Sequence, residues 1–146
     1  MTEFNKIVYL DTAPIVYFLD KNPYYGDITK RIVSFLISVN AKMVSSTITC
    51  EEYLVYAYRT GYEYMERAFF DFLSDCQIEI NDISRDIAKK AAHIRAEYKS
   101  FKAMDALQLA TACIKGCDIF LTNDKQLLQF HELQCVMVEQ FFEVII

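Results

Sequence analysis

Four acidic residues stand close to the expected starts of helices or ends of strands. Asp11 directly follows the apolar run IVYL (residues 7–10), and Asp124 follows DIFLTN. Glu52 lies about one turn into an expected helix, and Asp105 begins another. Carboxylate oxygens are the ligands that hard cations such as Mg²⁺ and Mn²⁺ prefer, and these cations support phosphodiester hydrolysis. The four acids are therefore candidates for one metal-dependent site.

Each acid also has a purely structural explanation. Asp105 and Asp124 suit helix capping, because a carboxylate satisfies free N–H groups and complements the helix dipole. The pair Glu51 and Glu52 is typical of an exposed helix face. Asp11 is harder to explain in this way, since the neighbouring Thr12 could cap equally well. The residues alone leave both interpretations open.

Short apolar runs without polar alternation alternate with helical patterns along the chain. The expected strands are residues 7–10, 41–47, 77–80, 118–122 and 135–139. The expected helices are residues 13–20, 24–40, 48–60, 62–76, 85–99, 104–116 and 124–130. This alternation predicts a three-layer α/β/α sandwich with a parallel sheet of about five strands, and residues 1–146 as one domain. Residues at the carboxyl ends of its strands would share one edge.

Composition and charge reduce the number of protein classes to which the chain could belong. The chain has 53% hydrophobic residues and a net charge of −5, which argues against a protein that binds nucleic acid by charge alone. Residues 84–102 nevertheless hold six Lys/Arg against two acids. Arg95 and Lys102 in this stretch are candidate substrate-binding residues, with a solvated helix surface as the alternative. The absence of an N-terminal apolar run, of a spanning-length apolar stretch and of CxxC predicts a reduced, cytoplasmic protein without membrane association.

Four sequence motifs together resemble the PIN-domain ribonucleases, and most strongly the VapC-type toxins of type II toxin–antitoxin systems. They are YLDTAPIVYFLD, SSTITCEEYLV, KAMDALQLATA and IFLTND, in that order, within a likeness that spans residues 6–139. Matching by position makes Asp11, Glu52, Asp105 and Asp124 the catalytic and metal-binding acids. Glu52 is chosen over Glu51 because it stands three residues after Thr49.

The resemblance also implies properties that the residues do not show directly. It implies a PIN-like fold, Mg²⁺ or Mn²⁺ as cofactor, and hydrolysis of RNA to 5′-phosphate products. It further implies a homodimer and a cognate antitoxin protein as partner. Thr12 and Thr122 match positions that often carry a hydroxyl near the metal or its ligands, and Asn123 is their expected neighbour.

Aromatic residues are concentrated in residues 53–72, which hold eight of the 21 Tyr and Phe of the chain. Aromatic rings can stack on unpaired bases, and they are also enriched in protein interfaces. We expect this helical hairpin to pack against the core and to form an antitoxin or dimer surface. Base stacking is the second interpretation.

Two other functions remain open. A non-catalytic PIN-like module would bind RNA or a protein partner, but such a module would be expected to lack one or more of the four acids, and all are present. A phosphotransfer protein would use Asp11 as phosphoacceptor. That class of site needs a second acid two residues later, where this chain has Ala13. The nuclease is therefore the favoured hypothesis.

Overall fold

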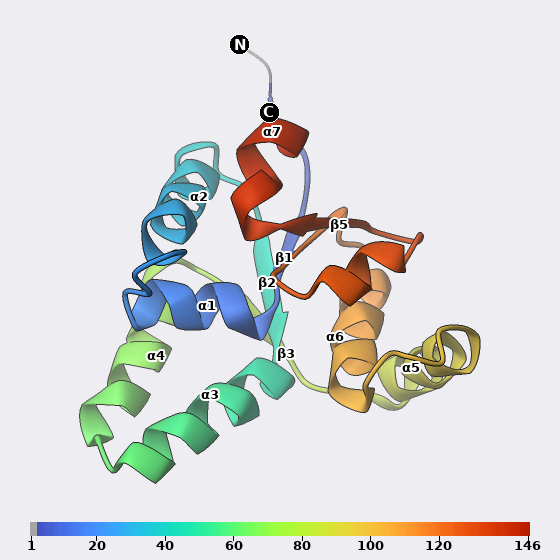
Figure 1. Ribbon diagram of the computed structural model, residues 1–146, viewed down its shortest axis with the longest axis horizontal. Helices are drawn as coiled ribbons and strands as arrows, with labels where there is room; N and C mark the ends of the chain where they lie inside the picture. The colour runs from blue at the N-terminus through green and yellow to red at the C-terminus, as the bar shows by residue number, and fades with distance from the viewer. Residues whose placement is uncertain (1–2) are drawn as a thin grey trace.

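The computed structural model describes residues 3–146 and contains a five-stranded sheet between layers of helices (Figure 1). From the sequence we expect no apolar run at the N-terminus, and residues 1 and 2 of that segment lie outside the described residues. The strands are β1 (Val8–Leu10), β2 (Met43–Ser46), β3 (Glu79–Asn81), β4 (Ile119–Thr122) and β5 (Gln134–Met137). Their order is β3-β2-β1-β4-β5, and every neighbouring pair is parallel. The predicted α/β/α architecture is confirmed.

The helices between the strands follow the sequence prediction closely. They are α1 (Thr12–Leu19), α2 (Gly26–Ser38), α3 (Thr47–Thr60), α4 (Glu63–Asp75), α5 (Arg85–Glu97) and α6 (Ala103–Ile114). A further helix, α7 (Phe141–Ile145), follows β5 and is not among the expected elements. Gly61 ends α3 at a φ of 76°, a conformation that suits a residue without a side chain.

Several boundaries differ from the prediction by one to three residues, and the differences at α2, residues 124–130 and β5 are the most informative. α2 begins later because the Asn22 side chain accepts the N–H groups of Tyr24 and Tyr25, which form a turn instead. The expected helix over 124–130 is a short 3-10 helix, η1 (Lys125–Gln129). β5 ends at Met137, because its partner β4 ends at the paired Thr122, and the 3-10 helix η2 (Val138–Gln140) follows.

Both faces of the central strand are buried, which explains why its sequence is apolar without alternation. Val8 and Leu10 pack into a cluster formed with α1, α2, α3, α4 and α7. Tyr9 points to the opposite cluster, where α5 and α6 pack on the sheet. Figure 1 shows α1 to α4 on one side of the strands and α5 and α6 on the other. β1 therefore ends in the middle of the molecule.

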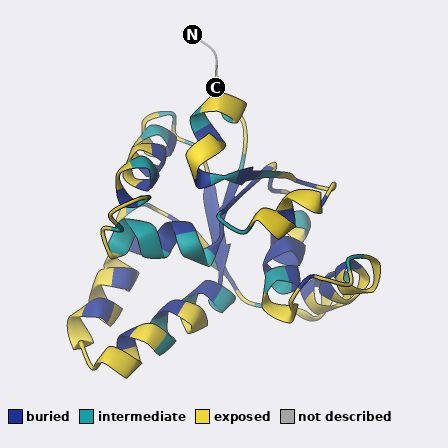
Figure 2. Cartoon of the chain, viewed as in Figure 1, coloured by how far each residue is buried: buried dark blue, intermediate teal, exposed yellow. Residues whose placement is uncertain are grey.

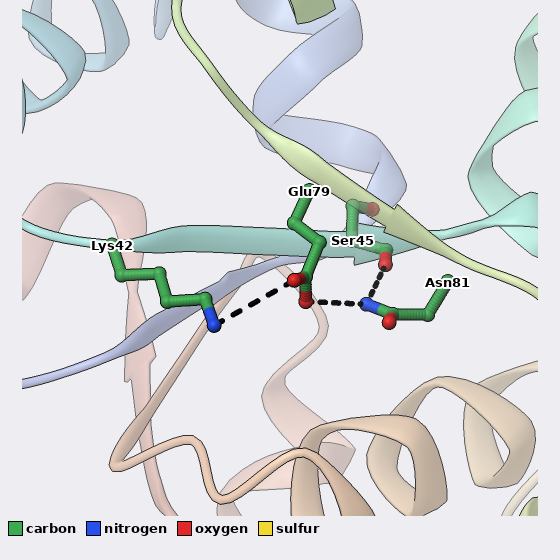
Figure 3. Close-up of polar contacts among 4 residues, drawn as sticks. All are labelled: Lys42, Ser45, Glu79 and Asn81. Atoms are coloured by element: carbon green, nitrogen blue, oxygen red, sulfur yellow. Dashed lines mark hydrogen bonds and ion pairs between the residues drawn. The ribbon is translucent and has the colours of Figure 1, made fainter.

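The β3 edge of the sheet is held by side chains as well as by backbone pairing (Figure 3). The buried Asn81 amide donates to the carbonyl oxygen of Ser45 and to Glu79 Oε2, each at 3.2 Å. Lys42 Nζ lies 3.6 Å from Glu79 Oε1. These contacts hold β3 to β2 in addition to the backbone pairing of the two short strands.

The aromatic hairpin of α3 and α4 divides its rings between the core and the surface (Figure 2). Tyr53, Phe69 and Phe72 are buried, and the Tyr53 and Phe69 rings stack at 4.9 Å. The five exposed rings are Tyr56, Tyr58, Tyr62, Tyr64 and Phe70. Core packing therefore accounts for three of the eight rings only.

Within residues 3–146, none of the helices has the length and apolar character needed to cross a bilayer.

Phe69 and Phe70 test this division between core and surface. Phe69 is fully buried, whereas Phe70 is 45% exposed. We expect Phe69→Ala to lower the free energy of unfolding by about 3–5 kcal/mol, because it leaves a cavity beside Tyr53. Phe70→Ala serves as the matched control, with an expected change of roughly 0.5 kcal/mol. Urea unfolding of both variants measures the difference, and equal losses would contradict the packing described.

Candidate active site

The candidate site lies where the strand order changes direction. Chain order runs outward from β1 through β2 to β3 on one side and through β4 to β5 on the other. Ligands of open parallel sheets bind outside the carboxyl ends of the strands at such a point. Asp11 directly follows β1, and Asp124 follows the adjacent β4 by two residues. The Asp11 N–H donates to the carbonyl of Leu121 at 3.0 Å, which joins the two strand ends.

Asp11 is a buried carboxylate with donors on both oxygens. It is 7% exposed and forms the N-cap of α1, where Oδ1 accepts the N–H of Thr12 at 2.8 Å. Oδ1 also accepts from the Gln108 amide at 2.9 Å. Oδ2 accepts from the Thr122 hydroxyl at 2.8 Å. Donors from three elements thus fix the orientation of this side chain.

Glu52 reaches the same place from α3. Its Oε1 accepts from the Thr12 hydroxyl at 2.6 Å, and Thr12 Oγ1 lies 3.2 Å from the Thr49 hydroxyl. Glu51 and Glu52 are both exposed on α3, and it is Glu52 that contacts Thr12. Thr12 therefore connects the carboxylate of Glu52 to the residue that follows Asp11, which is the geometry expected if Glu52 is the acid of this site.

Asp105 and Asp124 occupy different kinds of position. Asp124 is the N-cap of η1, and its Oδ1 accepts the N–H of Gln126 at 3.0 Å, so the capping interpretation is right for Asp124. The N-cap of α6 is Lys102, which puts Asp105 at the third helical residue. Capping therefore does not explain Asp105. Its charge still suits the first turn of α6 because the helix dipole is positive there.

The acids influence one another electrostatically. Burial raises the pKa of Asp11 to about 7, and the negative charges of Asp105 and Glu52 add to this rise, while the donors from Thr122 and Thr12 oppose it. Burial also raises the pKa of Asp105, together with the charges of Asp124 and Glu52. The Lys102 ammonium acts in the opposite direction on Asp105. All four acids therefore contribute to one region of negative potential.

The fit of this region to a cation can be judged from its donor groups. No three His, Cys, Asp or Glu side chains among residues 3–146 converge closely enough to hold a metal ion between them. Several of the carboxylates are instead engaged by hydroxyl, amide and backbone donors. Oxygen ligands with several negative charges nevertheless match the preference of Mg²⁺ and Mn²⁺. The donor chemistry fits such a cation once the side chains close around it.

Of the other residues that the sequence singled out, some lie next to the acids and Arg95 does not. Thr12 and Thr122 contact Glu52 and Asp11, as described. Asn123 Nδ2 donates to the Tyr17 hydroxyl at 2.6 Å, and its buried Oδ1 has no hydrogen-bond partner within the described part of the chain. Lys102 lies close enough to Asp105 to affect its pKa. Arg95 is exposed in the last turn of α5, and no contact joins it to the acids in the described structure.

Sequence reasoning missed Gln108 and Tyr9. Gln108 contacts Asp11, Thr12 and Glu52 through its amide nitrogen. Tyr9 donates to the amide oxygen of Gln108 at 2.6 Å. The available signal was an amide on the buried face of MDALQLATACI, a helix that is otherwise largely apolar.

Comparison with known proteins identifies the family. The sequence pattern of the PIN domain matches residues 8–133. The chain belongs to the PIN-domain family. Among curated proteins, no sequence matches this chain significantly.

The PIN fold of this chain is shared with several solved toxins. VapBC2 from Rickettsia felis, bound to a DNA fragment of its promoter, has a TM-score of 0.74 at 21% identity, over 90% of this chain and 98% of that chain. A toxin–antitoxin complex from Klebsiella pneumoniae has a TM-score of 0.69 at 26% identity, over 90% and 97%. VapC20 from Mycobacterium tuberculosis, a toxin that cleaves the sarcin–ricin loop, has a TM-score of 0.65 at 15% identity, over 87% and 98%.

The buried carboxylate of this PIN domain predicts a pH-dependent stability. Folding raises the pKa of Asp11 from 3.8 to about 7, so the folded protein binds the proton more tightly than the unfolded chain. In EDTA, stability from this group should be complete below pH 4 and lost as the pH rises to about 7. Asp11→Asn removes this titration. At pH 8, its free energy of unfolding should exceed that of wild type by up to about 4 kcal/mol.

Thermal and urea unfolding between pH 4 and pH 8 measures this effect. Asp71→Asn, which changes an exposed acid on α4, is the control and should follow the wild-type pH dependence. Parallel curves for wild type and Asp11→Asn would contradict a raised Asp11 pKa.

Proposed function

We propose that the protein is a metal-dependent endoribonuclease and the toxin of a toxin–antitoxin pair. The observation that carries this proposal is the electrostatic coupling of four acids from separate elements at the switch point of the sheet. A PIN domain with these four acids has the side chains that hydrolysis of a phosphodiester requires. The substrate is RNA, and the bond cleaved is a phosphodiester bond.

The acids would hold the cation, and their neighbours would hold the acids. Asp11, Glu52, Asp105 and Asp124 are the proposed ligands. When bound, Mg²⁺ or Mn²⁺ supplies positive charge for the scissile phosphate and activates the attacking water. The hydroxyls of Thr122 and Thr12 donate to Asp11 Oδ2 and Glu52 Oε1, and they orient both carboxylates in this way.

Positive side chains at the end of α5 and the start of α6 would bring the phosphate backbone of the RNA to the site. Lys102 lies at the start of α6 next to Asp105. Arg95, at the end of the preceding α5, would bind a phosphate of the RNA further from the cleaved bond. Lys/Arg contacts to phosphates supply affinity that weakens as salt concentration rises. Both residues would act in binding rather than in the reaction itself.

The exposed face of the aromatic hairpin is the proposed surface for a protein partner. Tyr58, Tyr64 and Phe70 line a surface pocket together with Arg67 and three acids. Clustered exposed aromatic rings are typical of interfaces. The Klebsiella neighbour was solved as a toxin–antitoxin complex, which supports an antitoxin as the partner here. The homodimer and the cytoplasmic location stay predictions of the sequence.

A non-catalytic PIN-like module is the second candidate. The observation that favours it is that no three metal-binding side chains within residues 3–146 converge on one point. Such a module would bind RNA or a protein without cleaving it. Cleavage assays separate the two functions directly.

Glu52 and its neighbour Glu51 provide a matched test of the nuclease. We expect single-stranded RNA to be cleaved with Mg²⁺ or Mn²⁺ and to remain intact in EDTA. Glu52→Gln should slow cleavage on the order of 100-fold or more, because a metal ligand supplies several kcal/mol of transition-state stabilisation. Glu51→Gln should keep wild-type activity. Gel analysis of labelled RNA measures both, and an inactive Glu51→Gln with an active Glu52→Gln would reverse the assignment.

Tyrosines at the tip of the hairpin test the partner surface. Tyr58→Ser with Tyr64→Ser should weaken binding of the co-expressed antitoxin at least about tenfold, since central aromatic residues contribute roughly 2 kcal/mol or more to interfaces. Tyr24→Ser is the matched control, because Tyr24 is 85% exposed and lies outside the hairpin, in the turn between α1 and α2. Calorimetric titration gives the affinities. Unchanged binding by the double variant would exclude this surface.

A further inference from the structure

Gln108 is a buried amide in a position where the helix is otherwise closed to water. It is 1% exposed and lies on α6, one helical turn after Asp105. Its buried neighbours on the same helix include Ala106 and Leu109. Burying an amide costs free energy unless it forms hydrogen bonds, so this side chain needs partners inside the protein.

The two ends of the amide meet different kinds of partner. Nε2 donates to Asp11 Oδ1 at 2.9 Å and to Thr12 Oγ1 at 3.0 Å, and it lies 3.4 Å from Glu52 Oε1. Oε1 accepts from the Tyr9 hydroxyl at 2.6 Å and from the Thr49 hydroxyl at 3.2 Å. The donor end therefore faces the acids, and the acceptor end faces two hydroxyls.

This orientation of the amide is set by its surroundings. The Tyr9 hydroxyl lies between Gln108 Oε1 and Ser46 Oγ, at 2.6 Å and 2.9 Å, and is itself buried. A hydroxyl can donate only one proton, and the short distance assigns that proton to the amide oxygen. With the amide reversed, its oxygen would face the carboxylate of Asp11. The amide oxygen and the carboxylate oxygens are both negative and would repel one another, so the observed orientation is the stable one.

We propose that Gln108 is a positioning residue that orients the carboxylates of Asp11 and Glu52 for a divalent cation, an inference that rests on the nuclease function proposed above. The amide nitrogen donates directly to Asp11 Oδ1, and it reaches Glu52 through the Thr12 hydroxyl, which accepts from the amide and donates to Glu52 Oε1 at 2.6 Å. Asp11 Oδ2 accepts one hydrogen bond, from Thr122, and the second oxygen of Glu52 accepts none from the described residues, so each oxygen keeps a lone pair for a ligand. Groups that orient metal ligands in this way set metal affinity.

A purely structural role for Gln108 makes a different prediction. If the amide only satisfied buried hydrogen bonds, its removal would lower stability and leave metal affinity unchanged. If it positions the acids, its removal weakens metal binding separately from any loss of stability. Metal affinity, measured on folded protein, distinguishes the two.

The experiment compares Mn²⁺ binding by the full chain and three variants, by calorimetric titration without RNA. Gln108→Met keeps the length of the side chain and removes the amide, so the Kd for Mn²⁺ should rise roughly 10–100-fold. Tyr9→Phe keeps the amide but removes the hydroxyl that orients it, and should weaken binding less. Thr111→Val is the matched control, because Thr111 is buried on the same helix and, among residues 3–146, its hydroxyl bonds only to the carbonyl oxygen of Leu107. It should bind Mn²⁺ like wild type.

Cleavage of RNA provides a second readout. Excess Mn²⁺ should restore the kcat of Gln108→Met, with the KM for RNA close to the wild-type value, because the acids themselves are intact. Should Gln108→Met fail to fold, Tyr9→Phe decides the question. A wild-type Kd for Mn²⁺ in the folded Gln108 or Tyr9 variant would overturn the positioning role.

The outcomes separate this inference from the proposed function. Cleavage by wild type together with unchanged Mn²⁺ affinity in Gln108→Met would reject the positioning role and leave the nuclease standing. Mn²⁺ binding that depends on Gln108, in a protein that does not cleave RNA, would reject the nuclease and keep the positioning role. A wild-type protein that binds no Mn²⁺ would overturn both.

Discussion

The burial of one carboxylate at the end of the central strand is the constraint on which the rest of the site depends. Asp11 stands where β1 leaves the sheet, almost inaccessible to water. A buried charge is costly unless it is paired or hydrogen-bonded. Donors therefore come from β4, through Thr122, from α1, through the backbone of Thr12, and from α6, through Gln108. The positions of these elements and the charge of Asp11 depend on one another.

The same constraint explains the polar residues in the core. Tyr9, Ser46 and Thr49 are buried side chains whose hydroxyls connect to one another or to Gln108. An apolar core of the same shape would be at least as stable, because buried polar networks rarely add stability over packed hydrophobic residues. Their arrangement instead directs the donor end of the Gln108 amide at the acids. The protein keeps a negatively charged site whose buried polar groups around Asp11 are hydrogen-bonded, at some loss of stability.

Much of this arrangement follows from the sequence, and the reasons for the exceptions are physical. The apolar runs predicted all five strands because a parallel sheet buried on both faces needs continuous apolar segments. Strand ends at one edge predicted that Asp11 and Asp124 would lie together. The role of Gln108 was not visible, because it depends on contacts with three elements distant in the chain. The late start of α2 was missed because the Asn22 side chain competes with the helix for backbone N–H groups.

If the four acids form one cation site, crystallography with Mn²⁺ should reveal the ion there. Diffraction data from crystals grown or soaked with Mn²⁺, collected at a wavelength where manganese scatters anomalously, locate the ion without reference to activity. We expect an anomalous peak at the carboxyl ends of β1 and β4, within bonding distance of Asp11 and of at least one of Glu52, Asp105 and Asp124. Well-diffracting crystals at millimolar Mn²⁺ with no peak there, or with a peak only at other residues, would contradict it.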